Sequence, residues 1–579
     1  MGTRTLRAIA LGSLFTTAAA CSSMVEHREG QTQIPPPQNP KAEVYVQELQ
    51  HESPLVEFEA QRSPTQSGLG NSTGRHSRSA KMKFGSPDVH MRRLKPAAHL
   101  GAQPVHTPTS LSREAYQHYQ ESDFADPRES PFSTFSTDVD TASYANMRRF
   151  LASGRLPIAD SIRIEEFLNY FEYEPMATQG EHPVGVATSW APCPWNPDNL
   201  LLQVRVETQA TPVTDLPPLN LVYLIDTSGS MHSQLALLVN GLSMLTQNLR
   251  EVDTVSIVTY AGTSGIALQP TNGLHRQTIL NALNNLRSGG STAGSEGIKT
   301  AYALARRNFQ VGSVNRVILA TDGDFNVGVS DQGSLVRLIE KERESGVFLS
   351  VLGFGRGNYQ DHRLESIADH GNGQYSYIDG PLEAHRVLVK RAGGTLNTVA
   401  KDVKLRLEFN PEHIGEYRLI GYDNRRLTSK EFADDKKDAG DIGAGHMVSA
   451  LYEITPRAKL STQAQTPSRY QTSRASVNAH SEEWLTTEVR YKLPQGLQST
   501  LLTHRTGRPA IETPLTRDWS LLASLAEFGL LLKDSKFKGE ASYQRVLKLA
   551  QAGAYGSHDP ARQEYVGLVA RAAQLAELD

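Results

Sequence analysis

The residues best suited to chemistry lie where an apolar run ends in an acid that is followed by two hydroxyls at alternate positions. Residues 221–225 are all apolar or aromatic, and Asp226, Ser228 and Ser230 come directly after them. Such a run indicates a buried parallel strand, and open α/β sheets bind ligands beyond the carboxyl ends of their strands. One carboxylate and two hydroxyls form an all-oxygen set that suits a hard cation such as Mg²⁺. Because the hydroxyls carry no net charge, a bound ion would keep positive charge to offer to a partner.

Two later segments repeat the pattern of a polar residue beside a predicted element. Thr292 ends the Gly-rich segment 289–292, just before a predicted helix, and Asp322 follows a second apolar run at 316–321. Each of these features alone is typical of a helix N-cap or a turn. Taken together, and each after the appropriate element, they favour a metal site.

This constellation resembles the metal-ion-dependent adhesion site of the von Willebrand factor type A domain. The family's motif is Asp-x-Ser-x-Ser, then a separate Thr, then a separate Asp after another strand. All five positions are matched in order, by Asp226, Ser228, Ser230, Thr292 and Asp322. The resemblance implies that the hydroxyls bind Mg²⁺ directly or nearly so and that the two aspartates often act through water. It also implies that a carboxylate of a protein partner completes the octahedron; Mn²⁺ or Ca²⁺ are alternative ions.

The elements that must position these residues occupy the middle of the chain. Between residues 216 and 392, predicted strands alternate with predicted helices, which is typical of an α/β doubly wound sheet, here with a short antiparallel edge hairpin. A chain of 579 residues is long enough for three or four domains. We therefore assign residues 216–392 to one von Willebrand factor A (Rossmann-like) domain, called the A domain below.

The flanks of the A domain carry strands and helices of their own. Residues 126–215 are predicted to hold helices and strands, residues 393–505 are β-rich, and residues 506–579 are helical. Neither flank has enough strands to bury its own apolar face. We expect strands from both sides to share one β-sandwich, with the A domain inserted into it and the C-terminal helices added at the end.

Two short motifs in the N-terminal flank, at 136–144 and 193–197, resemble a bacterial family of A-domain proteins. The resemblance implies an architecture of N-terminal segment, A domain and C-terminal region, and it says little about biochemistry. The first motif contains Asp138 and Asp140, which could suggest a calcium loop. The Gly and the distant Glu of such a loop are missing, so helix capping is the expected role.

The N-terminus predicts export and anchoring. Residues 1–21 begin with basic residues, continue with a short apolar run and end in Ala-Ala-Ala-Cys, which is similar to the lipobox of bacterial lipoproteins. The resemblance implies acylation of Cys21, and Ser22 after it implies the outer membrane. We expect the protein to face the periplasm, with the cell exterior as the alternative. The family prefers Leu where Ala18 stands, so ordinary signal cleavage remains an alternative. Residues 22–125 are predicted to be a disordered tether; its basic stretch at 73–96 is either a solvated spacer or a contact for an anionic surface.

Composition limits the classes of function. The net charge of -3 and the pI near 6.7 give no indication of a nucleic-acid-binding protein. Two cysteines, Cys21 and Cys193, cannot build a disulfide framework or a tetrahedral zinc site.

Two function classes remain, a non-catalytic binding protein and a metal-assisted hydrolase of the envelope. Hydrolysis requires a positioned base or nucleophile, and His232 and Asp324 are the nearby candidates. His-Glu-x-x-His and Gly-x-Ser-x-Gly motifs are absent from the sequence, which favours binding. A third class, partners of cytosolic ATPases, fits poorly with an export signal.

Overall fold

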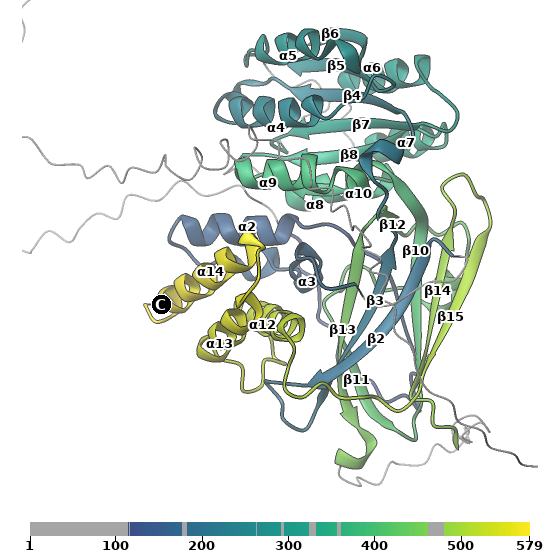
Figure 1. Cartoon of the computed structure of the whole chain (residues 1–579), viewed down its shortest axis with the longest axis vertical. Coiled ribbons are helices and arrows are strands. Elements are labelled where there is room, and N and C mark those ends of the chain that lie inside the picture. The colour runs from purple at the N-terminus through teal and green to yellow at the C-terminus, as the bar shows by residue number, and fades with distance from the viewer. Residues whose placement is uncertain are drawn as a thin grey trace, which may run out of the picture. The chain divides into compact units, whose positions relative to one another are not determined.

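The A domain contains one six-stranded sheet, as the alternation of strands and helices predicts. The computed structural model describes residues 114, 116–175, 182–261, 263–290, 294–323, 332–355, 360–460 and 480–578. The strand order is β6-β5-β4-β7-β8-β9, and all neighbours are parallel except β5 and β6, which form the predicted edge hairpin (Figure 1). The strands are β4 (Leu219–Asp226), β5 (Thr254–Ala261), β6 (Thr263–Asn272), β7 (Val314–Thr321), β8 (Phe348–Gly353) and β9 (Tyr375–Tyr377).

Helices cover both faces of this sheet. The side chains of its central strand, β4, alternate between two hydrophobic cores. Leu221, Tyr223 and Ile225 belong to one hydrophobic cluster, while Val222 and Leu224 belong to the other. Burial on both faces explains why β4 is a continuous apolar run. The helices of the domain are α4 (Leu235–Gln247), α5 (Arg276–Asn284), α6 (Gly294–Arg307), α7 (Gln332–Arg343), α8 (Asp361–His370), α9 (Pro381–His385) and α10 (Ala392–Leu396), with the π-helix η5 (Arg386–Lys390) and the 3-10 helices η3 (Gly229–Ser233) and η4 (Gly273–His275).

A β-sandwich is assembled from strands on both sides of the A domain, as expected. One sheet has the order β11-β13-β3-β2 and the other β1-β10-β14-β15, with β12 paired to β10 (Figure 1). Val204 of β3 is paired with Ala450 of β13, so strands from before and after the A domain are direct neighbours. The strands are β1 (Phe132–Ser136), β2 (Val184–Pro192), β3 (Leu200–Thr208), β10 (Thr398–Phe409), β11 (Ile414–Ile420), β12 (Gly440–Gly443), β13 (Met447–Pro456), β14 (Leu485–Lys492) and β15 (Ser499–Thr506). The A domain is therefore an insertion in the sandwich.

The helices of the N-terminal flank and those at the C-terminal end of the described chain share one hydrophobic core. Tyr144 and Phe167 from the N-terminal side lie in the same buried cluster as Leu525, Phe528 and Tyr565 from the C-terminal side. These helices are α2 (Ala142–Ala152), α3 (Ile164–Tyr170), α12 (Arg517–Leu532), α13 (Tyr543–Ala554) and α14 (Pro560–Ala576); the short elements are α11 (Ser429–Ala433), η1 (Ala159–Ser161), η2 (Val213–Asp215) and η6 (Arg457–Lys459). The C-terminal helices are thus part of a helical layer that also includes the N-terminal flank.

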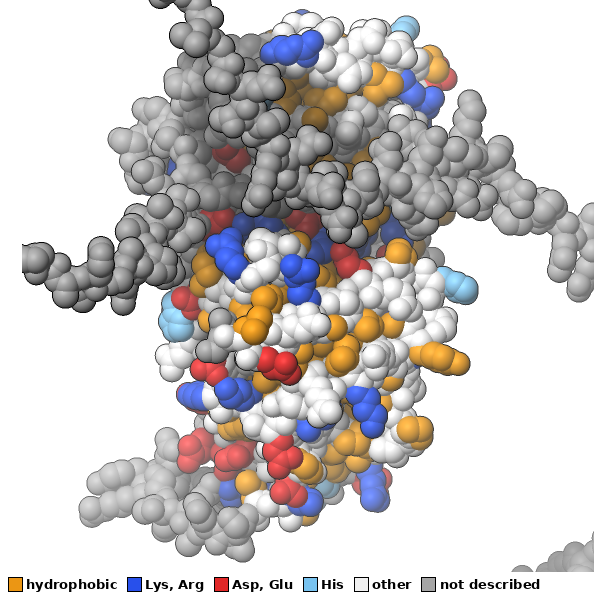
Figure 2. Space-filling view, turned by 90° about the vertical axis from the view of Figure 1, so that its left-hand side faces the viewer, with side chains coloured by type: hydrophobic (Ala, Val, Ile, Leu, Met, Phe, Trp, Pro, Cys, Tyr) orange, Lys and Arg blue, Asp and Glu red, His pale blue; other side chains and the backbone are white. Residues whose placement is uncertain are grey.

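Exposed apolar side chains are spread over the described surface. Large examples such as Val311, Leu497 and Tyr555 lie in turns or bends in different parts of the chain. On the face that Figure 2 shows, hydrophobic, basic and acidic side chains are interspersed. Within the described residues, no helix combines the length and the apolar character needed to span a membrane.

Candidate functional site

The carboxyl ends of β4 and β7 meet at one edge of the A-domain sheet, because the two strands are parallel neighbours. Ile225 is paired with Ala320, so Asp226 and Asp322 both follow at that edge. Burial raises the pKa of the Asp226 carboxyl, and the charge of the neighbouring Asp322 raises it further. A buried carboxylate beside a second acid favours a nearby cation.

Hydrogen bonds fix the carboxylate of Asp226 and place two hydroxyls beside it. Asp226 is fully buried; its Oδ1 accepts from the Ser228 backbone N–H at 2.9 Å, and its Oδ2 accepts from Thr321 Oγ1 at 3.1 Å. Ser228 Oγ and Ser230 Oγ lie 3.0 Å apart. The motif Asp-x-Ser-x-Ser therefore forms a single group of oxygen atoms. We call this group, together with Asp322, the strand-end site.

Thr292, the fifth predicted ligand, lies outside the described residues. The loop that leads to it is nevertheless tied to the strand-end site: the Gly289 N–H donates to Thr227 O at 2.7 Å, and Gly290 O accepts from the Gly229 N–H at 3.4 Å. Gly290 has a φ of +91°, and a Cβ there would lie 2.9 Å from the carbonyl oxygen of Ala261. Only glycine allows the loop to approach this closely.

Sequence reasoning missed two residues that shape the strand-end site. Thr321 bonds Asp226, and its own Oγ1 accepts from the Gly323 N–H at 3.3 Å. Gly355 packs against Asp322, where a Cβ would lie 3.1 Å from the aspartate Cβ. The signal available in the sequence was a hydroxyl that ends the apolar run of β7.

The donors of the strand-end site fit a hard divalent cation. They are carboxylate and hydroxyl oxygens, and Asp226 forms no ion pair with an arginine or lysine among the described residues. A fully buried carboxylate without a cationic partner is costly. Asp226, Ser228, Ser230 and Asp322 could hold such an ion with Thr292; the ligand roles of all five stay predictions.

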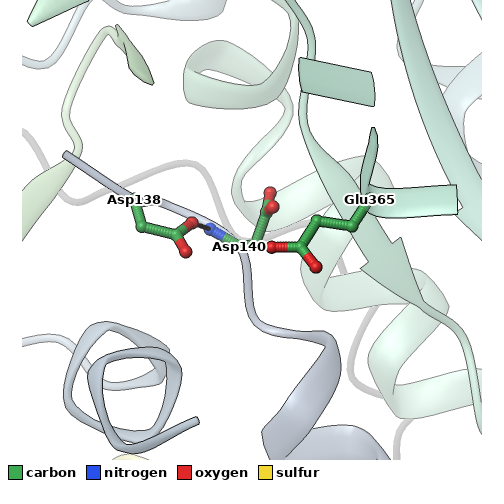
Figure 3. A group of neighbouring side chains, drawn as sticks. All are labelled: Asp138, Asp140 and Glu365. Carbon is green, nitrogen blue, oxygen red and sulfur yellow. Dashed lines mark hydrogen bonds between the residues drawn. The ribbon is translucent and has the colours of Figure 1, made fainter. Parts of the chain in front are cut away.

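A second group of carboxylates lies between the N-terminal flank and the A domain. Figure 3 shows Asp138 and Asp140, from the segment before α2, beside Glu365 of α8. Each offers an oxygen atom within 4.8 Å of the others. Arg425 already supplies the cation: its guanidinium lies 3.2 Å from Asp138, 3.4 Å from Asp140 and 3.1 Å from Glu365. This group is therefore an ion-pair cluster and not a vacant metal site.

The expected capping role of Asp138 and Asp140 is wrong. The N-cap of α2 is Thr141, which makes no side-chain capping bond. Asp138 Oδ1 instead accepts from the Asp140 N–H at 2.9 Å, and Asp140 Oδ1 accepts from the N–H of Tyr375 in β9 at 2.9 Å. The two buried carboxylates find backbone and arginine partners across the junction, which local sequence could not reveal.

This junction carries more buried acid than buried base. Arg163 contacts Asp361 at 2.6 Å and Glu365 at 3.1 Å, and it also pairs with Glu166. Burial raises the pKa of Glu365 to about 7 and that of Glu166 to about 8. We call the whole group the seam cluster; it consists of Asp138, Asp140, Glu166, Asp361, Glu365 and Asp369 with Arg163 and Arg425.

Comparison with known families agrees with this architecture. A model of the von Willebrand factor type A domain matches residues 220–387, one described as von Willebrand factor matches 110–203, and one described as "Uncharacterized protein YfbK, C-terminal" matches 394–575.

Solved structures similar to the chain at low identity include two single proteins with this domain. The von Willebrand factor type A protein from Catenulispora acidiphila is 15% identical with a TM-score of 0.38, covering 67% of this chain and 89% of that one. The ArnB paralog VWA2 from Sulfolobus acidocaldarius is 13% identical with a TM-score of 0.32, covering 68% and 98%.

Among curated proteins, "Uncharacterized protein sll0103" from Synechocystis sp. (strain ATCC 27184 / PCC 6803 / Kazusa) is 28% identical over 36% of this chain and 50% of that protein. "Uncharacterized protein YfbK" of Escherichia coli (strain K12) is 40% identical over 466 residues, which cover 78% of this chain and 80% of that protein. The chain therefore belongs to the family of the Escherichia coli protein YfbK, and it carries a von Willebrand factor type A domain inserted between its two flanks.

Proposed function

We propose that the chain is a non-catalytic adhesion or scaffold protein of the bacterial envelope that grips an acidic group of a protein partner through Mg²⁺. The observation that carries the proposal is the strand-end site, where two serine hydroxyls 3.0 Å apart adjoin the buried carboxylate of Asp226. Mn²⁺ or Ca²⁺ could replace Mg²⁺, because each accepts oxygen ligands.

The chemistry of the site explains why the partner should be acidic. A bound divalent ion would act as a Lewis acid. If the two aspartates bind it through water, they offset its charge only in part. Ser228 and Ser230 contribute oxygen atoms without charge, and Thr321 holds Asp226 in place. A carboxylate from a partner is the hard, anionic ligand that fits the remaining position.

The proposal is tested by crosslinking the full-length protein to partners with Mg²⁺ and with EDTA. Asp226→Ala should abolish the Mg²⁺-dependent crosslinks, and Asp215→Ala, an exposed acid outside the site, should leave them unchanged. Circular dichroism checks that both variants fold. Equal capture in EDTA, or full capture by Asp226→Ala, would refute a metal role.

No catalytic step is part of this proposal. A hydrolase would need a base beside the ion, and His232 is hydrogen-bonded through Nδ1 to Ser288 Oγ at 2.8 Å. Asp324, the other candidate base, lies outside the described residues. Hydrolysis of a phosphate ester or peptide that is lost in both Asp226→Ala and His232→Ala would support the alternative, a metal-assisted hydrolase.

Acylation of Cys21 is proposed as the anchor, with the protein on the outer membrane and facing the periplasm. Cys21 and residues 22–113 lie outside the described residues, so this rests on the sequence. The end of the expected disordered tether is ordered instead: Glu114 pairs with Arg149 at 2.8 Å, and the Ala125 N–H donates to Tyr417 O at 2.9 Å. Cys21→Ser should move the protein from the membrane fraction to the soluble fraction. Unchanged fractionation would contradict a lipid anchor.

A further inference from the structure

A pocket of about 500 Å³ lies where the chain passes between the β-sandwich and the A domain. Residues 210–212, on the way into the domain, form one wall, and residues 390–394, on the way out, form another. The end of α3 and the turn between β12 and β13 close the rest. A molecule bound here would contact both crossings of the chain.

Arg391 and Lys390 both line this pocket, and Arg391 differs from the neighbouring cations in its ion-pair partners. Arg386 is paired with Glu383 at 2.9 Å and Lys390 with Glu172 at 3.0 Å. Arg391 forms no ion pair with a carboxylate of the described residues. It is half-buried, and burial lowers its pKa to about 9, with the charge of Arg386 acting in the same direction. A guanidinium without a direct ion-pair partner at this depth favours an anion.

The hydrogen bonds of Arg391 leave donors for a ligand. Its Nη1 donates to Asn169 O at 3.3 Å and its Nη2 to Tyr170 O at 2.8 Å, which are carbonyls at the C-terminal end of α3. A cation at this helix end is favourable, which explains how the guanidinium is held. Since arginine has five N–H donors, three have no hydrogen-bond partner among the described residues.

Apart from Arg391 and the Lys390–Glu172 ion pair, the lining is neutral and largely apolar. His446 accepts at Nδ1 from Gln374 Nε2 at 3.3 Å, and burial, followed by the charge of Arg391, lowers the histidine pKa to about 3, so the ring carries no charge at neutral pH. The apolar and aromatic walls come from Val139, Phe171, Tyr173, Pro175, Ala444 and Met447.

We propose that this pocket binds an organic carboxylate with an apolar tail, whose carboxylate contacts Arg391 and whose tail lies on the wall around Phe171 and Met447. A planar carboxylate matches the fork of a guanidinium. The volume of about 500 Å³ is within the range of small-molecule sites. The pocket is separate from the strand-end site and needs no metal.

The test is isothermal titration of the full-length protein in EDTA with acetate, hexanoate and 4-phenylbutyrate. At least one of the two apolar carboxylates should bind saturably with one site per chain. Acetate, 4-phenylbutanol and inorganic phosphate should each bind at least about 10-fold more weakly, because each lacks either the tail or the carboxylate. Absence of saturable binding by both apolar carboxylates overturns the proposal, as does equal binding of 4-phenylbutanol.

Variants locate the binding. Arg391→Gln should weaken it by about 10-fold or more, and Ala210→Trp, at an exposed wall position, should block it by filling the pocket. Arg457→Gln is the matched control, since Arg457 also donates to backbone carbonyls, Pro411 O at 2.9 Å and Ile414 O at 3.2 Å, outside the pocket. Undiminished binding by folded Arg391→Gln and Ala210→Trp would overturn the proposal. Asp226→Ala should bind like the wild type, which separates this result from the metal-site test.

Discussion

The strand-end site and the seam cluster are both groups of buried carboxylates, yet they are neutralised differently. In the seam cluster, guanidinium groups contact the acids directly, with Arg425 between 2.7 and 3.4 Å from four of them. In the strand-end site, Asp226 is surrounded by hydroxyl and backbone donors. The first arrangement joins two parts of the protein, and the second leaves the buried carboxylate of Asp226 without an ion-pair partner among the described residues.

This difference shows why proximity of acids alone does not identify a metal site. Asp138, Asp140 and Glu365 meet the distance requirement for sharing an ion, but Arg425 occupies the cation's role. What distinguishes the strand-end site is the mixture of neutral hydroxyls with few carboxylates. Neutral hydroxyls can bind a cation without cancelling its charge, so an ion held there, as proposed, would still attract an acidic partner.

The largest expected effect comes from removing Arg425, one of the two arginines of the seam cluster. Arg425→Ala leaves Asp138, Asp140 and Glu365 without this guanidinium, and the loss of one partner from a buried ion pair costs about 3–5 kcal/mol. Urea unfolding of the full chain measures the change. Arg426→Ala is the control, because the Arg426 side chain is 45% exposed and surface pairs contribute about 0–1 kcal/mol. Equal effects of the two substitutions would mean that the cluster does not stabilise the junction.

The second prediction concerns pH. The pKa of Glu365 is raised from 4.5 to about 7 in the folded protein, chiefly by burial. The folded state therefore keeps a proton that the unfolded state has lost, and stability from this group is present below pH 4.5 and is lost as pH rises to about 7.

Glu365→Gln should remove this dependence. Relative to the wild type, the free energy of unfolding of the variant should rise with pH between 5 and 7, by at most about 1.4 kcal/mol per pH unit. Urea titrations at pH 5, 6 and 7 measure the trend. A constant difference between variant and wild type across this window would contradict a raised pKa of Glu365.

The third and smallest expected effect tests which of the two clusters binds the metal ion. Mg²⁺ at about 100 times its Kd should stabilise the wild type by about 2.7 kcal/mol, and Asp226→Asn should lose this gain. Asp138→Asn should keep it, since the seam cluster is expected to bind no ion. Thermal melts with Mg²⁺ and with EDTA measure both. If Asp138→Asn alone lost the Mg²⁺ effect, the roles of the two clusters would be reversed.

Much of the fold could be predicted because strand and helix periodicities are local. Residues 221–225 and 316–321 were expected as strands and lie within β4 and β7. The inserted arrangement followed from counting strands in each flank and is confirmed by the pairing of β3 with β13. The helices at the two ends were also expected, but their shared core was not. An apolar stripe such as that of Tyr144 and Met147 indicates that a helix face is buried, but it does not indicate which element packs against that face.

The candidate site divides in the same way. Asp226, Ser228 and Ser230 could be selected from sequence because their spacing follows one strand, and parallel neighbours bring Asp322 to the same edge. The contact of Gly355 with Asp322 joins segments distant in sequence, so no local pattern could predict it. The same holds for Arg425 and Glu365, which meet only across the junction.

The sequence by itself determined which residues end the strands of the A domain and that the flanks had to combine, since periodicity and strand count are properties of local segments. Only the tertiary structure decided which buried acids meet an arginine, and that Arg391 lines a pocket without a carboxylate partner among the described residues. The physical reason is that charge compensation depends on distances of a few ångströms between residues far apart in the chain, and packing of whole elements sets those distances.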